Sequence, residues 1–151
     1  MTRMTRYLTL LAFAAAASLA FAGVAAAQPA KAGKQVVQHV ELVVKSDDQH
    51  GKKGSDGKWH DAFLPASFKV KAGAKVLVTV VNYDDMAHSF HSKGLKTNAI
   101  IMPGTDKGKA TTFAFTAPKT AGKYLWNCDP KCDPWAMKHV GFMKGYVTVV
   151  G

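Results

Sequence analysis

Short runs in which apolar and polar residues alternate recur along this sequence, and their period of two residues predicts β-strands. The run VVQHVELVV is an example, since it alternates and is rich in the β-branched residues that favour strands. Beyond the N-terminal stretch, apolar residues nowhere keep a helical period for three turns. The predicted strands cover residues 36–44, 66–70, 75–82, 99–102, 110–116, 123–128 and 145–150.

Turn-forming residues separate these predicted strands. Residues 45–58 are polar, charged and glycine-bearing, which is typical of a surface loop. Pro65 and Pro118 stand beside turn signals, where a proline does not interrupt a hydrogen-bonded ladder. Several short strands divided by such turns predict an all-β fold, either a sandwich or a barrel.

The N-terminal stretch has a different pattern. Two arginines, an apolar run rich in alanine and leucine, and the small residues AAA before Gln28 are typical of a secretory signal. We therefore expect residues 1–27 to be a signal peptide, 28–35 a flexible lead and 36–151 a single domain. No stop-transfer pattern follows the apolar run, so we expect no membrane span in the mature chain. We expect the protein to be periplasmic or secreted.

The charge of the chain narrows the classes of partner. The formal net charge is +10, and it falls to +8 once Arg3 and Arg6 leave with the signal peptide. Every remaining basic residue is lysine, whereas readers of nucleic-acid sequence rely on the bidentate guanidinium of arginine. We therefore expect no nucleic-acid partner, and a lysine-rich surface favours an acidic partner protein.

Residues 127–150, NCDPKCDPWAMKHVGFMKGYVTVV, hold both cysteines of the chain between two predicted strands. Cys128 and Cys132 stand four positions apart, and His139 and Met143 follow in the same loop. Thiolate, imidazole and thioether groups are the donors that copper takes, so this loop is a candidate copper site. Such a site needs a second imidazole, and His88 in NYDDMAHSFHS supplies one directly after a predicted strand.

Other interpretations of these residues stay open. In an oxidising compartment Cys128 and Cys132 can form a disulfide, which closes a small loop and adds little stability. Two cysteines and two histidines can also hold zinc, which leaves Met143 without a role. His91 is the alternative imidazole, and Met137 competes with Met143 as the thioether.

Over residues 63–150 the chain resembles a cupredoxin domain. Members of that family carry the first ligand histidine in an N-x-D…H-S-F context, and their ligand cysteine ends a G-x-Y-x-x-x-C strand. The second histidine and the methionine follow in the next loop, before the closing strand. The matching residues of this chain are Asn82, His88 and Phe90 for the first motif, Gly122, Tyr124 and Cys128 for the second, and His139 and Met143 for the loop.

Two cysteines separated by three residues also resemble the binuclear copper site (CuA) of cytochrome c oxidase subunit II, in which both thiolates bridge two coppers. The later spacing departs from that pattern. Six residues separate Cys132 from His139 where the family has three, and three separate His139 from Met143 where it has two. The mononuclear pattern needs one cysteine, and Cys128 at the strand end then takes that place. The resemblance implies either one type 1 copper or two coppers of CuA type.

The resemblance implies an all-β, Greek-key β-sandwich of cupredoxin type, with copper at one end. The implied function is one-electron transfer with a redox partner protein, and the alternative is a copper carrier or storage protein that holds Cu(I) without redox cycling. We expect a monomer and no enzyme activity, because no Ser–His–Asp arrangement, phosphate-binding glycine loop or paired-carboxylate motif stands out. The implied metal ligands are His88, Cys128, Cys132, His139 and Met143.

Overall fold

The structure, a computed structural model, describes residues 36–129 and 132–151, so the expected signal peptide and lead lie outside the described residues. All of the described residues belong to one unit, Ala32–Gly151. Within these ranges no helix is long and apolar enough to cross a membrane. The strands are β1 (Val37–Lys45), β2 (Lys52–Lys53), β3 (Trp59–His60), β4 (Ala62–Leu64), β5 (Phe68–Lys71), β6 (Lys75–Asn82), β7 (His88–Ser92), β8 (Thr97–Ile101), β9 (Lys109–Thr116), β10 (Gly122–Asn127) and β11 (Lys144–Val150).

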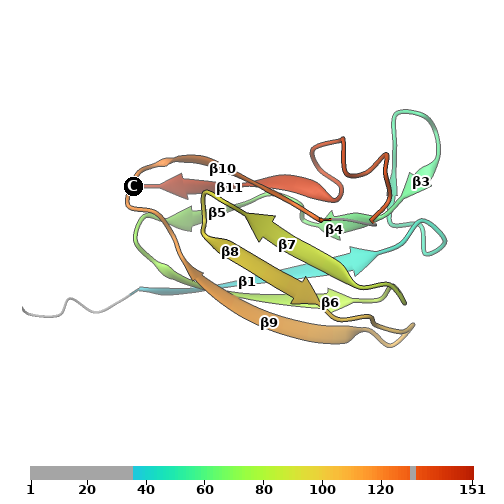
Figure 1. The fold of residues 1–151 in the computed structure, drawn as a ribbon, viewed down its shortest axis with the longest axis horizontal. Coiled ribbons are helices and arrows are strands. Elements are labelled where there is room, and N and C mark those ends of the chain that lie inside the picture. The colour runs from blue at the N-terminus through green and yellow to red at the C-terminus, as the bar shows by residue number, and fades with distance from the viewer. Residues whose placement is uncertain (1–35, 130–131) are drawn as a thin grey trace, which may run out of the picture. The chain divides into compact units, whose positions relative to one another are not determined.

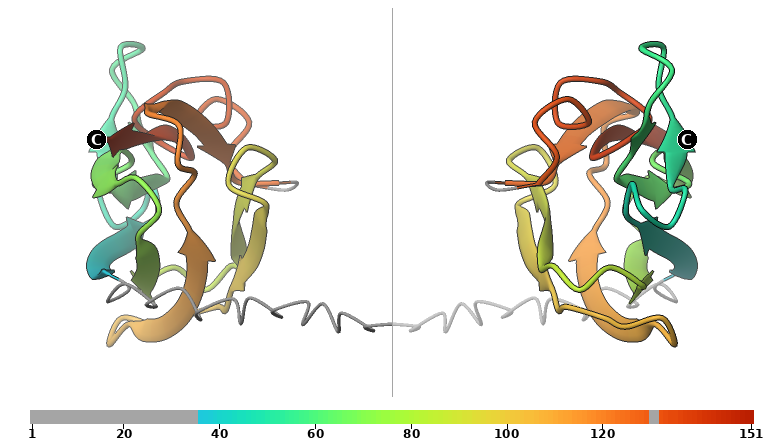
Figure 2. Two further views of the ribbon diagram at one scale, coloured as in Figure 1. Left: turned by 90° about the vertical axis from the view of Figure 1, so that its left-hand side faces the viewer. Right: turned by 90° about the vertical axis from the view of Figure 1, so that its right-hand side faces the viewer.

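Two sheets face each other across a shared interior (Figures 1 and 2). Among the described residues, one sheet has the strand order β4-β1-β6-β9 and the other has β5-β11-β10-β7-β8. β1 pairs with β6 in parallel and β11 pairs with β5 in parallel, whereas the other pairs within these two sheets are antiparallel. β2 and β3 form a small separate hairpin. The predicted all-β sandwich is confirmed.

The interior follows from the alternation that predicted the strands. In β6 every second residue is buried, which brings Val76, Val78 and Val80 to the inner face. Across the core, the indole of Trp126 packs against Phe63 and Phe90 at ring-centroid distances of 4.8 and 4.5 Å. The indole Nε1–H donates a 2.8 Å hydrogen bond to a backbone carbonyl oxygen, so this fully buried polar group is satisfied.

Asn82 ties together the segments at one end of the sandwich, where β1, β6 and β10 end and β7 begins (Figure 1). Its side-chain amide donates to the carbonyl oxygens of Met86 (2.9 Å) and Met102 (3.0 Å), and its Oδ1 accepts the N–H of Asp84 (3.0 Å). Gly104 packs so closely here that a Cβ would overlap the carbonyl oxygen of Asn82. The hydrogen bonds of Asn82 and the close packing of Gly104 therefore fix the turn between β6 and β7.

Three parts of the strand prediction were wrong or incomplete, and the first is that the sequence did not predict β4. The sequence did not predict β7, and it placed His88 after a strand, whereas the residue begins this strand. The loop prediction for residues 45–58 missed the short pairing of Lys52–Lys53 with Trp59–His60. Pro65 and Pro118 lie outside the strands, as predicted, and the Leu64–Pro65 peptide bond is cis.

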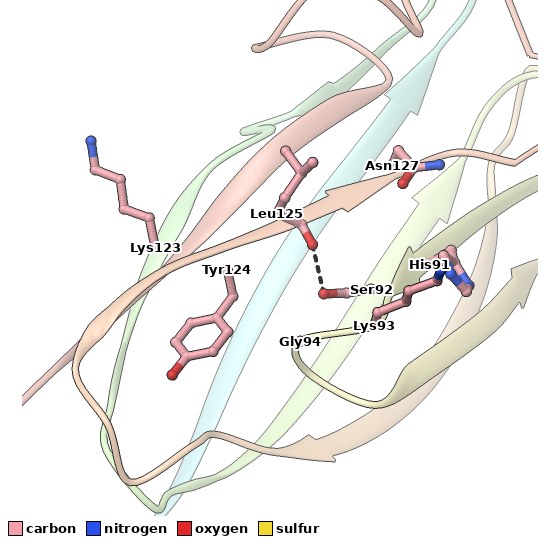
Figure 3. Close-up of a pocket in the computed structure, with 8 residues that line it drawn as sticks. All are labelled: His91, Ser92, Lys93, Gly94, Lys123, Tyr124, Leu125 and Asn127. Carbon is pink, nitrogen blue, oxygen red and sulfur yellow. Dashed lines mark hydrogen bonds between the residues drawn. The ribbon is translucent and has the colours of Figure 1, made fainter.

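β7 and β10 diverge soon after they meet. The ladder between them contains the pair Asn127 and His91, and beyond it the hydroxyl of Ser92 donates a 2.6 Å hydrogen bond to the carbonyl oxygen of Leu125 (Figure 3). A cavity of about 360 Å³ occupies the gap between the two strands. His91 lines this cavity and is partly buried.

Candidate metal centre

Cys128 leaves the end of β10 with a fixed backbone. The residue is fully buried, and its N–H donates a 2.8 Å hydrogen bond to the carbonyl oxygen of Met143, at the far end of the loop. β10 pairs with β11 as far as Asn127 and Lys144, so this bond extends the ladder by one step into the loop. The two ends of the loop between β10 and β11, at Cys128 and Met143, are therefore hydrogen-bonded to each other.

Asp133 fixes the backbone that follows Cys132. Its Oδ1 accepts the N–H groups of Trp135 (2.8 Å) and Ala136 (3.0 Å), while its carbonyl oxygen accepts the N–H of Met137 (3.0 Å). This is the pattern of an N-cap followed by one helical turn, which the Asp-Pro dipeptide favours. The turn holds the Cys132 side chain toward the interior, where only 7% of the residue is exposed.

The Sγ atoms of Cys128 and Cys132 lie within disulfide distance of each other. Nδ1 of His88 points at this pair, 3.8 Å from Cys128 Sγ and 3.5 Å from Cys132 Sγ. All three residues are buried, and their donor atoms lie within 4.8 Å of one another. The structure thus gathers two sulfur atoms and one imidazole nitrogen, which are donors that suit a soft or borderline metal ion.

The other ring nitrogen of His88 is occupied. Nε2 lies 2.7 Å from Oδ2 of Asp84, and both side chains are almost entirely buried. Nε2 thus faces the carboxyl group of Asp84, whereas Nδ1 faces the sulfur atoms. The ring of Phe63 stands edge-on to this imidazole, with centroids 6.2 Å apart, and covers it from the core.

Asp61 is a second carboxylate beside this histidine. Oxygen atoms of Asp61 and Asp84 and a ring nitrogen of His88 lie within 4.8 Å of one another. Burial raises the pKa of Asp61; the hydrogen bond from the Asp47 N–H opposes this, and the negative charge of Asp84 adds to it. Asp61 and Asp84 therefore form a pair of carboxyl groups beside His88.

Ser89 joins the two strands next to the sulfur atoms. Its backbone N–H lies 3.3 Å from Cys128 Sγ, within the distance for a weak N–H···S hydrogen bond. Its hydroxyl accepts the N–H of Asp129 at 2.7 Å and donates to the carbonyl oxygen of the same residue at 3.0 Å. The hydroxyl thus supplies hydrogen bonds that a continuing β-ladder would otherwise make.

Met143, His139 and Met137 lie in different surroundings. Met143 is fully buried in the same hydrophobic cluster as both cysteines, and Met137 is partly buried at the edge of that cluster. His139 is partly exposed; its Nδ1 bonds to the carbonyl oxygen of Trp135 at 2.7 Å, and its ring stacks on that indole at 3.6 Å. Among the described residues, His139 does not belong to the close group of donor atoms around His88. The complete ligand set stays a prediction.

Trp135 is enclosed by two imidazoles. His60 stacks on its other face, with ring centroids 4.0 Å apart, and Phe142 stands edge-on to the indole at 5.0 Å. His60 is fixed in turn by Asp133 at 2.6 Å from Nδ1 and by Asp56 at 3.0 Å from Nε2. The β2–β3 hairpin therefore packs against the cysteine loop through a stack of three rings, those of His60, Trp135 and His139.

The charge state of His60 reflects these partners. Burial lowers the pKa of His60, but hydrogen bonds to Asp133 and Asp56, together with their negative charges, outweigh it and raise the pKa above its ordinary value. Burial raises the pKa of Asp133, whereas hydrogen bonds from the Ala136 N–H, from His60 and from the Trp135 N–H lower it to a net value below the ordinary one. Both shifts favour an ion pair between His60 and Asp133.

Sequence reasoning found His88, Cys128 and Cys132, which the structure brings together, but it missed the side chains that support them. Asp84 and Ser89 flank His88 closely in the sequence, and Asp133 follows Cys132 directly. A signal for Asp84 was present, because a buried turn with an aspartate four residues before a ligand histidine can supply a carboxylate to its ring.

Residues 11–149 match the cupredoxin-like domain family, so the chain belongs to that family. Among solved structures, the chain is similar to a chain of a haem-copper terminal oxidase dimer, at 19% identity and a TM-score of 0.46, over 75% of this chain and 65% of that one. It is also similar to the multicopper oxidase mgLAC, at 17% identity and a TM-score of 0.51, over 76% of this chain and 39% of that one. The chain thus spans less than two thirds of each of these chains, and at 17% identity the likeness to mgLAC concerns the fold alone. No curated protein matches the chain.

Proposed function

We propose that this protein binds copper between His88, Cys128 and Cys132 and transfers single electrons to or from a partner protein. The carrying observation is the approach of His88 Nδ1 to both sulfur atoms, at 3.5 and 3.8 Å, in a buried position of a cupredoxin-like domain. Thiolate and imidazole donors fit copper, and bound copper would supply the chemistry of cycling between Cu(II) and Cu(I).

The residues around the centre suit such a role because they are held rigidly. Asp84 orients His88, Ser89 fixes the strand beside Cys128, and Asp133 fixes the turn after Cys132. Cys128 and Cys132 are almost entirely buried in the hydrophobic cluster, which keeps water from the sulfur atoms and lowers the local dielectric constant. Within the proposal, Met143 supplies a further soft donor from the same hydrophobic cluster, and His139 is the second imidazole.

The second candidate is a carrier or storage protein for Cu(I). The observation that favours it is the position of His139, whose Nδ1 is engaged with the loop backbone. Two thiolates and one imidazole form a soft donor set, and thiolate ligands select Cu(I). A carrier would bind Cu(I) without colour, whereas an electron-transfer centre would show a thiolate-to-copper absorption band and a reversible potential.

The partner and location are part of the same proposal. We propose an acidic redox partner, because the chain after residue 27 has an excess of lysine over acidic residues and no arginine. Export to the periplasm or the exterior is supported by the sequence pattern of residues 1–27. The protein itself is proposed to be a monomeric electron-transfer protein without enzyme activity.

The test begins with fully reduced protein, in which both thiols have been counted, loaded with copper and separated from free metal. We expect bound copper, a thiolate band in the visible spectrum, and loss of that band in Cys128→Ser. Electron paramagnetic resonance separates the two stoichiometries, since hyperfine structure from one copper nucleus indicates a mononuclear centre and structure from two indicates a mixed-valence pair. An unchanged band in Cys132→Ser would exclude the binuclear centre.

A matched pair of histidine variants on β7 controls this experiment. His88→Gln is expected to lose the copper signal, whereas His91→Gln, which alters the cavity between β7 and β10, is expected to keep it. Failure of the reduced wild-type protein to retain copper would contradict the proposal.

A further inference from the structure

We propose that Asp84 is a positioning residue that makes Nδ1 of His88 the metal-binding nitrogen. This inference rests on the proposed copper site, but its first step concerns the protein without metal. A neutral imidazole exists in two tautomers, and it can bind a metal ion only through the nitrogen that lacks the proton. The group that faces Nε2 therefore decides whether Nδ1 is available.

The geometry makes Asp84 that group. Its Oδ2 lies 2.7 Å from Nε2, and its Oδ1 accepts the N–H of Met86 at 3.2 Å. Both oxygen atoms thus have donors facing them, and the side chain is held in one orientation. With Nε2 protonated, the lone pair of Nδ1 points to the two sulfur atoms, 3.5 and 3.8 Å away.

Asp84 is itself fixed by its surroundings. Its N–H donates to Oδ1 of Asn82 at 3.0 Å, and its carbonyl oxygen accepts the N–H of Gly104 at 2.7 Å. A chain of contacts therefore runs from the buried amide of Asn82 through Asp84 to His88 and the sulfur atoms. Groups that orient a ligand histidine in this way commonly contribute about 10- to 100-fold to metal affinity.

The substitution Asp84→Asn tests the role of the carboxylate because it keeps the size and changes the hydrogen bonding. An asparagine has one accepting oxygen for two donors, the Nε2–H and the Met86 N–H. When the amide NH₂ faces the ring, it favours a lone pair on Nε2 and a proton on Nδ1. We expect the reduced, metal-free variant to populate this second tautomer, in which Nδ1 faces the sulfur atoms with its proton.

The controls are two other aspartates. Asp85→Asn makes the same change at the neighbouring exposed residue, and Asp61→Asn removes a carboxylate from the same cluster without removing a hydrogen bond to the ring. Both controls are expected to keep the wild-type tautomer. Asp85→Asn is also expected to keep the wild-type copper affinity.

The experiment uses ¹⁵N-labelled, reduced, metal-free protein and long-range ¹H–¹⁵N correlations of the His88 ring, at a pH at which the ring is neutral. We expect Nε2–H in the wild-type protein and a shift toward Nδ1–H in Asp84→Asn. Competition for Cu(I) with a chromophoric chelator is then expected to show an affinity about 10- to 100-fold lower in Asp84→Asn than in the wild type.

Two results would overturn the inference. The first is an Nδ1–H tautomer in the wild-type protein, which needs no variant to fold. The second is a folded Asp84→Asn variant with the tautomer and the Cu(I) affinity of the wild type. If the wild-type protein binds no copper, the proposed function fails, while the tautomer measurement still decides whether Asp84 orients His88.

Discussion

Ser89 carries several of the contacts that hold the two strands of the candidate centre together. Its N–H faces Cys128 Sγ, and its hydroxyl both donates to and accepts from the backbone of Asp129. A hydroxyl can serve both functions at once because it combines one proton with two lone pairs. One small buried side chain thus replaces a step of the β-ladder at the point where β7 and β10 meet the cysteine loop.

Removal of this hydroxyl should weaken the fold locally. We expect Ser89→Ala to lower the free energy of unfolding by about 1 to 2 kcal/mol, because two backbone groups of Asp129 lose their partner. The measurement is urea denaturation of the reduced, metal-free protein. Ser55→Ala, in the exposed turn of the β2–β3 hairpin, is the control and should change the stability little. Equal effects of the two substitutions would show that the Ser89 hydroxyl contributes nothing.

At the scale of single residues, the sequence pointed to the two cysteines and His88, which the structure brings together. It did not point to the residues that hydrogen-bond to them. Cysteines at a strand end and a histidine in an H-S-F context are visible as residue types in order. The hydrogen bonds of Asp84 and Ser89 depend on turn angles and on contacts between segments about 40 residues apart, which no local pattern encodes. The engagement of His139 with Trp135 depends on the helical turn that Asp133 begins, which the strand-based interpretation of this region did not include.

At the scale of elements, the β2–β3 hairpin and the cysteine loop stabilise each other. His60 comes from the hairpin, and Trp135 and Asp133 come from the loop. Lys52 adds a 2.8 Å hydrogen bond to the carbonyl oxygen of Gly141 and lies over the ring of Phe142. A segment that the sequence showed only as a polar loop thus contributes to the order of the candidate centre.

The contacts of His60 with Asp133 and Asp56 predict that the stability of the protein depends on pH. Because the folded state raises the pKa of His60, its contribution to stability is complete below the ordinary pKa of histidine, about 6.5, and is lost as the pH rises through the raised value. We expect the free energy of unfolding of the wild type to fall over this range more steeply than that of His60→Gln. Denaturation of the reduced, metal-free proteins between about pH 5.5 and 8.5 gives the two curves. Parallel curves would contradict the expectation.

Strands that the sequence predicted bury alternate residues, whereas β7 does not. β6 and β11 bury alternate residues, so their strand period is visible in the hydrophobic pattern. In β7, by contrast, His88, Ser89, Phe90 and Ser92 are all buried. Its polar residues are satisfied by particular partners such as Asp84 and the backbone of β10, and therefore the sequence HSFHS shows no alternation.

At the scale of the whole molecule, the stability of the sandwich comes from its core. The two facing sheets bury an aromatic centre formed by Trp126, Phe63 and Phe90, together with the valines of β1, β6 and β11. The sandwich could be predicted because short alternating strands and turns leave few other architectures. The pairing of β1 with β6 in parallel could not, since it depends on contacts between strands that are distant in the sequence.

A bond between the cysteines should matter little to the fold. Cys128 and Cys132 enclose a very short segment of chain, and loop-closure entropy gives such a bridge a contribution of about 2 kcal/mol. We expect the metal-free protein to remain folded in excess reductant, with a modest decrease in the free energy of unfolding. Circular dichroism and urea denaturation with and without reductant measure this. Complete unfolding on reduction would show that the core alone does not hold the sandwich.

The divergence of β7 from β10 makes a seam in the five-stranded sheet. The two sides of the seam meet at Asn127 and His91 and through the hydroxyls of Ser89 and Ser92. His88 belongs to one side and both cysteines to the other, so a metal ion bound by all three residues would link the two sides of the seam. Metal binding and the stability of this sheet are consequently linked equilibria. Tighter metal binding would also increase the free energy of unfolding.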